Sequence, residues 1–323
     1  MSTISASTTT TTAYKVVADT TGSLVLQTGA TPTTAMTIDS SQYTTLPALA
    51  DPTAPSAGNL KTFAKTIAGG YTAPAFLNAT NSVVQLQPAF ANKKIGSVGF
   101  SANTTLTISG MGTFSGTATS VTYANTNFYS RIIKTAFNST GTAGTFGNYY
   151  QTVAWYQLGV SGTPNFGGFY YVVRFGIGDA VASPRTFVGL SSATSAPTNV
   201  EPSTLTNSIG VGQGASDTNL KIYYGGSAAQ TAIDLGANFP TNTNSVDWYE
   251  LTLFAPPSST NTVYYQVIRL NTGNVASGTL TGTAGTVLPA NTTALAVRNW
   301  RTNNATASAV TLHLGSIYME TDY

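Results

Sequence analysis

From residue 82 onward the chain is a succession of short runs rich in β-branched and aromatic residues, divided by clusters of glycine, asparagine and proline. Runs of this length between turn residues are typical of β-strands. Because no long helical pattern alternates with them, a parallel α/β fold is not expected. The predicted strands are Val83–Gln87, Ile95–Phe100, Thr105–Ser109, Val121–Tyr123, Phe169–Phe175, Thr186–Leu190, Ser208–Val211, Leu220–Tyr224, Thr231–Leu235, Trp248–Phe254, Val263–Leu270, Val275–Leu280, Ala294–Val297 and Thr311–Met319.

Two hairpins and the spacing of the runs indicate the fold class. The segment LKIYYGGSAAQTAIDLG turns at Gly225-Gly226, and YYQVIRLNTGNVASGTL turns at residues 271–274. Many short strands separated by turn signals suit two packed antiparallel sheets. We therefore expect an all-β main domain over residues 82–323, a β-sandwich or jelly roll of the concanavalin-like type.

Two smaller parts are expected before residue 82. Residues 1–50 combine a Ser/Thr-rich arm with a β element too small to bury a core by itself, whose strand-like runs are Tyr14–Ala18, Ser23–Gln27 and Thr34–Ile38. Residues 51–81 are expected to form a linker with one short helix over 57–68. The helix signals are Ser56 as N-cap, an apolar face of Leu60, Phe63, Ala64 and Ile67, and Gly69-Gly70 as a stop. That face would dock on its own domain or against copies of itself.

Charge and cysteine content exclude several classes of protein. Only 7% of the residues are charged and the net charge is +2, against about 25% charged residues in an average domain. No basic stripe for nucleic acid is present, and the absence of cysteine excludes disulfides, zinc–thiolate sites and thiol nucleophiles. No apolar stretch predicts membrane insertion, and MSTISASTTTTTAY lacks the regions of a secretory signal.

The segment SVDWYELTLFAPP places Asp247 and Glu250 beside aromatic residues, as the cleft of a sugar-cleaving enzyme would. Side chains alternate along a strand, so these two carboxylates point to opposite faces. A glycosidase needs both on one sugar, about 5–10 Å apart. We predict a structural strand, with Leu251 and Leu253 toward the core and Trp248 and Glu250 on the other face, against solvent, a second sheet or a neighbouring subunit. A pair of acids from different strands stays possible.

Other chemical motifs are weak. His313 is the only histidine and no G-x-S-x-G motif accompanies it, so we interpret it as a polar position on a half-exposed strand, on the same face as Thr311. The segment SDTN offers Asp217 and Asn219 without the glycine and glutamate that complete a calcium loop. The sequence therefore assigns no catalytic, cofactor-binding or metal-binding residue.

Two aromatic clusters are candidate contact sites. NYYQTVAWYQ contains Tyr149, Trp155 and Tyr156, and NWRTNN contains Trp300 beside Arg301. Exposed rings stack on sugar faces while amide and guanidinium groups bind hydroxyls, so these five residues are candidates for contact with a glycan or a partner protein. Core packing and burial between subunits are the alternative, because large aromatic side chains dominate cores and interfaces.

Segments along nearly the whole chain resemble virion proteins of tailed phages and prophages. TTGSLVLQTGATPTTAMTIDSSQ resembles a repeat-like element of fibre and neck-appendage proteins, and APSAGNLKTFAKTIAGG resembles the short helix that follows it. GGFYYVVRFGIGDA, YELTLFAPP and LPANTTALAVRNWRTNNATA are similar to a C-terminal domain that recurs in these virion proteins. The resemblance carries over no functional residue.

The resemblance implies a non-enzymatic, homotrimeric virion appendage, a tail or head fibre assembled in the host cytoplasm and exposed on the particle. Residues 1–50 would anchor it to other virion proteins. The sandwich would contact a host-surface glycan or neighbouring virion proteins. Two alternative functions are a capsid or neck decoration protein without a receptor role, and a glycan depolymerase.

Overall fold

The computed structural model describes residues 22–28, 33–48, 50, 52–68, 71–79, 83–85, 94–100, 107–108, 112–116, 118–160, 167–257 and 261–321. The chain divides into two compact units. Unit 1 is Met1–Thr66 with Gly70–Gln87, and unit 2 is Ile67–Gly69 with Pro88–Tyr323. In the described part of the chain, no helix is long and apolar enough to span a membrane.

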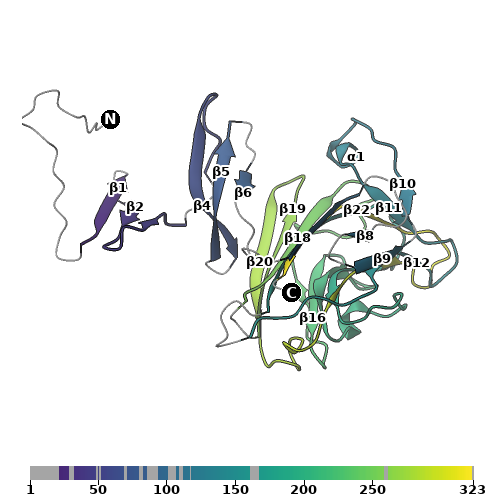
Figure 1. Cartoon of the computed structure of the whole chain (residues 1–323). Coiled ribbons are helices and arrows are strands. Elements are labelled where there is room, and N and C mark those ends of the chain that lie inside the picture. The colour runs from purple at the N-terminus through teal and green to yellow at the C-terminus, as the bar shows by residue number, and fades with distance from the viewer. Residues whose placement is uncertain are drawn as a thin grey trace, which may run out of the picture. The chain divides into compact units, whose positions relative to one another are not determined.

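Unit 1 contains two three-stranded sheets (Figure 1). The first has the order β1 (Leu24–Thr28), β2 (Thr33–Ile38) and β3 (Thr44–Thr45), and the second has the order β4 (Leu60–Ala68), β5 (Tyr71–Asn78) and β6 (Val83–Gln85). Strands β1 and β2 confirm the strand predictions at Ser23–Gln27 and Thr34–Ile38. The predicted run at Tyr14–Ala18 and the Ser/Thr-rich arm lie outside the described residues.

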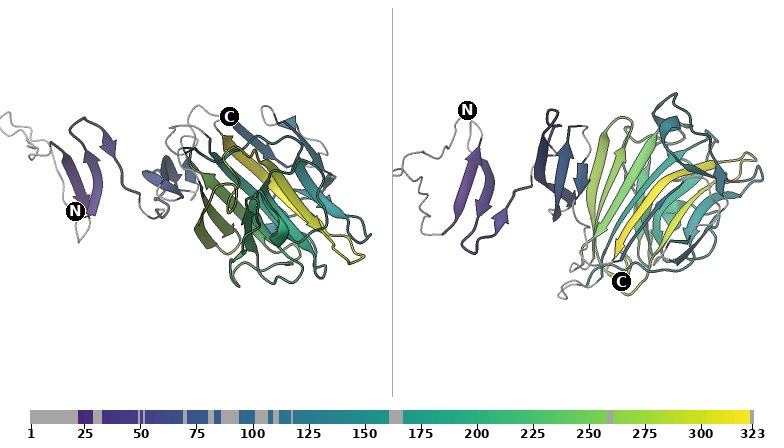
Figure 2. Two further views of the ribbon diagram at one scale, coloured as in Figure 1. Left: turned by 90° about the horizontal axis from the view of Figure 1, so that it is seen from below. Right: turned by 45° about the horizontal axis from the view of Figure 1, so that its top comes forward.

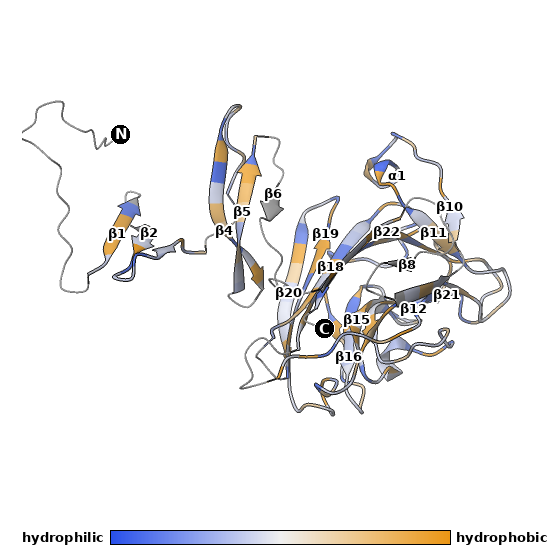
Figure 3. Ribbon diagram, in the orientation of Figure 1, coloured by the Kyte–Doolittle hydropathy of each residue, from blue (hydrophilic) through white to orange (hydrophobic). Residues whose placement is uncertain are grey.

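The helix predicted over 57–68 is wrong, because Leu60–Ala68 forms strand β4. A short run of apolar residues fits the period of a helix and that of a strand about equally well. Three turns of helix are marginal in water, whereas β4 is hydrogen-bonded to β5. Gly69-Gly70, interpreted as a helix stop, is equally a hairpin-turn signal in sequence. Figure 3 shows hydrophobic and hydrophilic residues alternating in bands along β4 and also along β19.

Unit 2 contains two eight-stranded sheets, whose paired strands are antiparallel (Figures 1 and 2). The first sheet has the order β10 (Ala118–Ser120), β11 (Thr135–Asn138), β22 (Thr311–Thr321), β13 (Phe169–Ile177), β18 (Trp248–Ala255), β19 (Thr262–Arg269) and β20 (Asn274–Thr281), with β7 (Lys94–Gly99) also paired to β22. The second sheet has the order β17 (Ile233–Asp234), β16 (Lys221–Gly225), β15 (Ser208–Gln213), β14 (Arg185–Ser191), β21 (Ala296–Thr302), β12 (Phe146–Gln151), β9 (Gly112–Gly116) and β8 (Thr107–Ile108). The predicted all-β sandwich is confirmed.

The core of unit 2 lies between these sheets. Along β13, Tyr171 and Val173 are fully buried. Arg174, the next residue, points to the opposite face of the sheet and is exposed. Val188 and Val211 of the second sheet belong to the same buried apolar cluster. Alternation of this kind buries one face of each strand against the opposite sheet. The hydrophobic effect therefore holds the two sheets together over their inward faces.

The sheets approach closely at one margin, between β11 and β12. A Cβ atom on Gly147 would lie 1.9 Å from the backbone oxygen of Phe137. That separation leaves no room for any side chain, so glycine is required at this position. Between β10 and β11 the chain forms its short helix, α1 (Phe128–Arg131), whose N-cap is Asn127. The strand predicted at Val121–Tyr123 is wrong, because these residues precede that helix without joining a sheet.

Candidate functional site

Four of the five predicted contact residues are buried. Tyr149, Tyr156, Trp300 and Arg301 are at most 2% exposed, and Trp155 is half-buried. The interpretation of these four as exposed glycan contacts is therefore wrong for the single chain. Alternation along β12 and β21 points Tyr149 and Arg301 inward. Trp300 lies on the opposite face, where Phe187 and Tyr223 pack around it.

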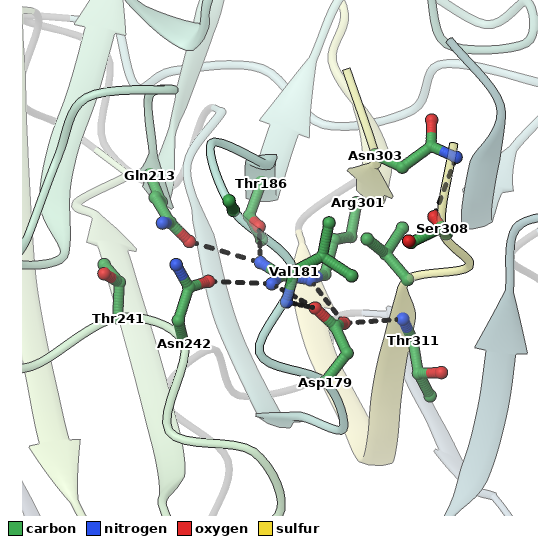
Figure 4. A network of polar contacts seen from close by, with 12 residues as sticks. Asp179, Val181, Thr186, Gln213, Thr241, Asn242, Arg301, Asn303, Ser308 and Thr311 are labelled. Carbon is green, nitrogen blue, oxygen red and sulfur yellow. Dashed lines mark hydrogen bonds and ion pairs between the residues drawn. The ribbon is translucent and has the colours of Figure 1, made fainter. Parts of the chain in front are cut away.

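Arg301 instead joins the two sheets through a buried ion pair (Figure 4). Its Nε and Nη2 atoms donate to the two carboxylate oxygens of Asp179 at 2.8 and 2.7 Å. Its Nη1 atom donates to Thr186 Oγ1 at 2.7 Å and to Gln213 Oε1 at 3.2 Å, and Nη2 also donates to Asn242 Oδ1 at 2.8 Å. A bidentate pair of this kind fixes geometry as well as charge.

Asp179 connects this group to the first sheet. It follows β13, and its Oδ2 atom accepts the backbone N–H of Thr311 at the start of β22 at 2.7 Å. Thr186 and Gln213 lie on β14 and β15 of the second sheet, beside Arg301 of β21. With both charges neutralised and hydrogen-bonded, the cluster is a structural clamp between the sheets and offers no free group for catalysis.

Asp247 and Glu250, the two acids that suggested a sugar-cleaving enzyme, have separate structural roles. Asp247, fully buried, accepts two hydrogen bonds from Arg269 at 2.7 and 3.0 Å. Glu250 pairs with Arg174 across the first sheet at 2.6 Å. Leu251 lies in the core, as predicted, and the outward face of Trp248 is covered by Tyr129 of α1, at a ring-centroid distance of 5.3 Å.

The carboxylates of Glu201 and Asp217 lie close to each other around Gly214. A Cβ atom there would lie 2.9 Å from Glu201 Oε2 and 3.0 Å from Asp217 Oδ2. Arg185 binds Glu201 at 2.7 Å and Lys221 binds Asp217 at 2.5 Å. Burial opposes ionisation of Asp217, but hydrogen bonds from Lys221 and Tyr223 outweigh it and lower its pKa. The lowered pKa keeps Asp217 ionised near neutral pH, so Asp217 does not suit the role of a general acid.

The weak calcium signal at SDTN is explained by the same contacts. The Oδ1 atom of Asp217 binds the Lys221 ammonium, and its Oδ2 atom accepts from the Gly214 N–H at 2.7 Å and from the Tyr223 hydroxyl. Both carboxylate oxygens of Asp217 are therefore already engaged by groups of the protein itself. Among the described residues, no group of three or more His, Cys, Asp or Glu side chains is placed to hold a metal ion.

His313 is buried rather than half-exposed, so that expectation is wrong. It is 7% exposed, and its Nδ1 atom lies 2.6 Å from the Tyr129 hydroxyl. Burial lowers its pKa to about 4, and the charge of Lys134 adds to the effect. Its predicted position on the face of Thr311 is confirmed by the close approach of both side chains to Gly178. The sequence did not reveal that α1 covers this face.

A row of aromatic rings crosses the outward face of the first sheet. It consists of Tyr318 on β22, Tyr170 on β13, Phe254 on β18 and Tyr264 on β19, and successive ring centroids are 6.2 Å apart. The three tyrosines are half-buried and Phe254 is 2% exposed. We call this set the outer aromatic row. Sequence reasoning missed it, although strand alternation places Tyr170 and Phe254 opposite the core.

Comparison with known proteins gives no assignment. No family of known sequences matches this chain, and no curated protein matches it. Among solved structures, arcelin-5, a lectin-like defense protein from Phaseolus vulgaris, is 9% identical and covers 72% of this chain and all of its own, with a TM-score of 0.45. Lectin II from Ulex europaeus is 11% identical over 71% of this chain and 99% of its own, with a TM-score of 0.45. A protein of unknown function from Shewanella oneidensis MR-1 is 16% identical over 73% and 90%, with a TM-score of 0.36. Likeness this distant carries no functional argument.

Proposed function

We propose that this protein is a non-enzymatic structural protein of a phage virion, a fibre-like homotrimer whose sandwich contacts a host-surface glycan or a neighbouring virion protein. The observation that carries the proposal is the outer aromatic row. Its tyrosines combine a flat apolar ring with a hydroxyl, which suits sugar faces and protein interfaces alike. On the outward face around it, Arg174 pairs with Glu250, and the Tyr318 hydroxyl donates to Glu320 Oε1 at 2.8 Å.

The ion pairs support the absence of catalysis. Five carboxylates of unit 2, Asp179, Glu201, Asp217, Asp247 and Glu250, each bind an arginine or lysine. Acid–base catalysis needs a carboxyl whose pKa is poised near the working pH. Each of these five acids is held by a cation within the fold, which fits a structural role.

Exposed apolar residues of unit 1 support a role in attachment and self-association. In the first sheet of unit 1, Val25 is 47% exposed, Leu26 is 41% exposed and Tyr43 is 71% exposed. Between Leu24 and Thr45, no described apolar side chain is buried. A three-stranded sheet with no buried apolar side chain is not stable alone. Contact with equivalent sheets of sister subunits or with another virion protein would cover it.

Binding of the full chain to host cell envelopes and to immobilised glycans tests the proposal. Tyr170→Ala combined with Tyr264→Ala should weaken binding about tenfold or more, equivalent to roughly 1.4 kcal/mol per site, and avidity in a trimer multiplies the loss. Tyr123→Ala is the matched control, because Tyr123 is 58% exposed and lies outside the row. Thermal unfolding checks that the variants remain folded.

Of the following three results, the first and third would refute parts of this function, and the second would decide between its two contacts. Equal loss in the Tyr123→Ala control would remove the outer aromatic row from the binding site. If the wild-type chain binds no envelope or glycan while it remains bound to particles, the contact is with virion proteins and the role is decoration. Release of reducing ends from host polysaccharide would show a depolymerase and contradict the non-enzymatic function.

A further inference from the structure

The edges of the two sheets in unit 2 differ in length and chemistry. The edge strands β8 and β17 have two residues each, and β10 has three. Strand β7, six residues long, begins at Lys94 and contains two glycines. Short or charged edge strands are common protection against pairing with another chain. Among the described strands of unit 2, β20, with eight residues, is the longest edge strand.

Strand β20 has none of the usual protection. Its sequence, NVASGTLT, contains no charged residue and no proline. It pairs with β19 without a bulge, from Asn274 opposite Arg269 to Thr281 opposite Thr262. Within the described residues, no strand pairs with its second edge. Its outward side chains Val275, Ser277, Thr279 and Thr281 are exposed. A long, regular and uncharged edge offers a row of backbone groups to another strand.

We propose that β20 pairs antiparallel with β20 of a second copy of this chain, about a two-fold axis perpendicular to the sheet. The absence of charge favours a copy as the partner, because a strand that pairs with itself places each charge near its own like charge. A two-fold axis of this kind is the commonest symmetry between identical chains. The first sheets of the two copies then form one continuous sheet.

The side-chain pattern and the length of the strand restrict the register. A perpendicular axis keeps outward residues outward, so an outward residue must face another outward residue across the contact. An axis at Ser277 satisfies this condition and pairs seven of the eight residues, Asn274 to Leu280. Ser277 then faces its own copy, and Val275 faces Thr279. Hydroxyl and β-branched side chains are favourable cross-strand partners. A two-fold contact cannot relate subunits within a three-fold trimer, so in the proposed homotrimer β20 pairing would join two trimers. It is independent of the outer aromatic row and of any association through unit 1.

Charge substitutions at the proposed axis test the contact. Ser277→Lys and Ser277→Glu should each halve the mass of the full-chain species in sedimentation, and mixing the two variants should restore it. Recovery on mixing shows that neither substitution damages the fold. Thr119→Lys is the matched control, because Thr119 is exposed on the short edge strand β10. Unchanged mass in both Ser277 variants, or equal dissociation in the control, would overturn the proposal.

Disulfide cross-linking gives a second readout that other subunit contacts do not affect. The chain has no cysteine, so Ser277→Cys introduces one thiol per copy. Directly opposed residues have Cβ atoms about 4.5–5.5 Å apart, close to the distance of a disulfide. On mild oxidation, Ser277→Cys should give a two-chain band on a non-reducing gel, and Thr119→Cys should not. The absence of that band, or its appearance in both variants, would refute β20 pairing.

Discussion

His313 makes the stability of unit 2 sensitive to mild acid. The imidazole is buried beneath Tyr129, with Lys134 as a nearby positive charge and Asp179 as the opposing negative one. Its pKa is lowered from 6.5 to about 4. The folded state therefore binds a proton less readily than the unfolded state. The stabilisation is complete above pH 6.5 and is lost as the pH falls toward 4.

The magnitude follows from the difference in pKa. A shift from 6.5 to about 4 corresponds to a limiting loss of about 3.4 kcal/mol, at 1.36 kcal/mol per pKa unit. Between pH 7 and pH 5 the linkage relation gives a loss of about 1.8 kcal/mol. This range lies above the titration of ordinary carboxyls, so histidine dominates it. Because His313 is the only histidine, a single substitution isolates the effect.

Urea unfolding at pH 7 and pH 5 measures this difference, with tryptophan fluorescence as the signal. The wild-type free energy of unfolding should fall by about 1.8 kcal/mol more than that of His313→Gln over this range. Tyr129→Phe is a control for the hydrogen bond. It should lower stability at both pH values by about 1 kcal/mol and keep the pH dependence, because burial is the largest cause of the shift. Equal pH dependence in wild type and His313→Gln would refute the reasoning.

Two further substitutions test the contacts between the sheets. Arg301→Met leaves Asp179, 9% exposed, without its cation. Denaturant unfolding should show that the free energy of unfolding falls by about 3–5 kcal/mol. A fall below about 1 kcal/mol would contradict the structural role of the clamp. Gly147→Ala should cost about 1–3 kcal/mol or more by thermal unfolding, because its Cβ atom meets the Phe137 oxygen at 1.9 Å. Gly99→Ala, where nothing lies within 4 Å, should be near neutral, and similar losses in both would contradict the close approach.

Sequence pattern predicted the sandwich because strand alternation and turn residues are local signals. The runs that became β13, β18, β19 and β22 were found close to their observed bounds. Strand β12, FGNYYQ, was missed, since its glycine and asparagine weaken the strand signal and its partner β21 is distant in sequence. Strand β4 was mistaken for a helix because its short apolar run fits the period of either structure. Pairing with a neighbouring strand, rather than local propensity, decided both.

The candidate site was less accessible to sequence reasoning. Aromatic residues are equally suited to a core and to a surface, and burial depends on which loops and sheets cover a strand. Trp300 points away from the core between the sheets, yet it is 1% exposed. The outer aromatic row could have been inferred in part from alternation at Tyr170 and Phe254. Its assembly required the order of four strands, which non-local hydrogen bonds determine.

The position of β22 has a consequence for biosynthesis. It lies between β13 and β11 in the first sheet and pairs with β13 from Phe169 opposite Thr321 to Ile177 opposite Leu312. A ribosome releases β13 long before β22, so residues 178–310 are made while that edge stays open. Pairing over such a separation is slow, and an open apolar sheet is prone to aggregation. The sandwich must therefore close after translation of β22.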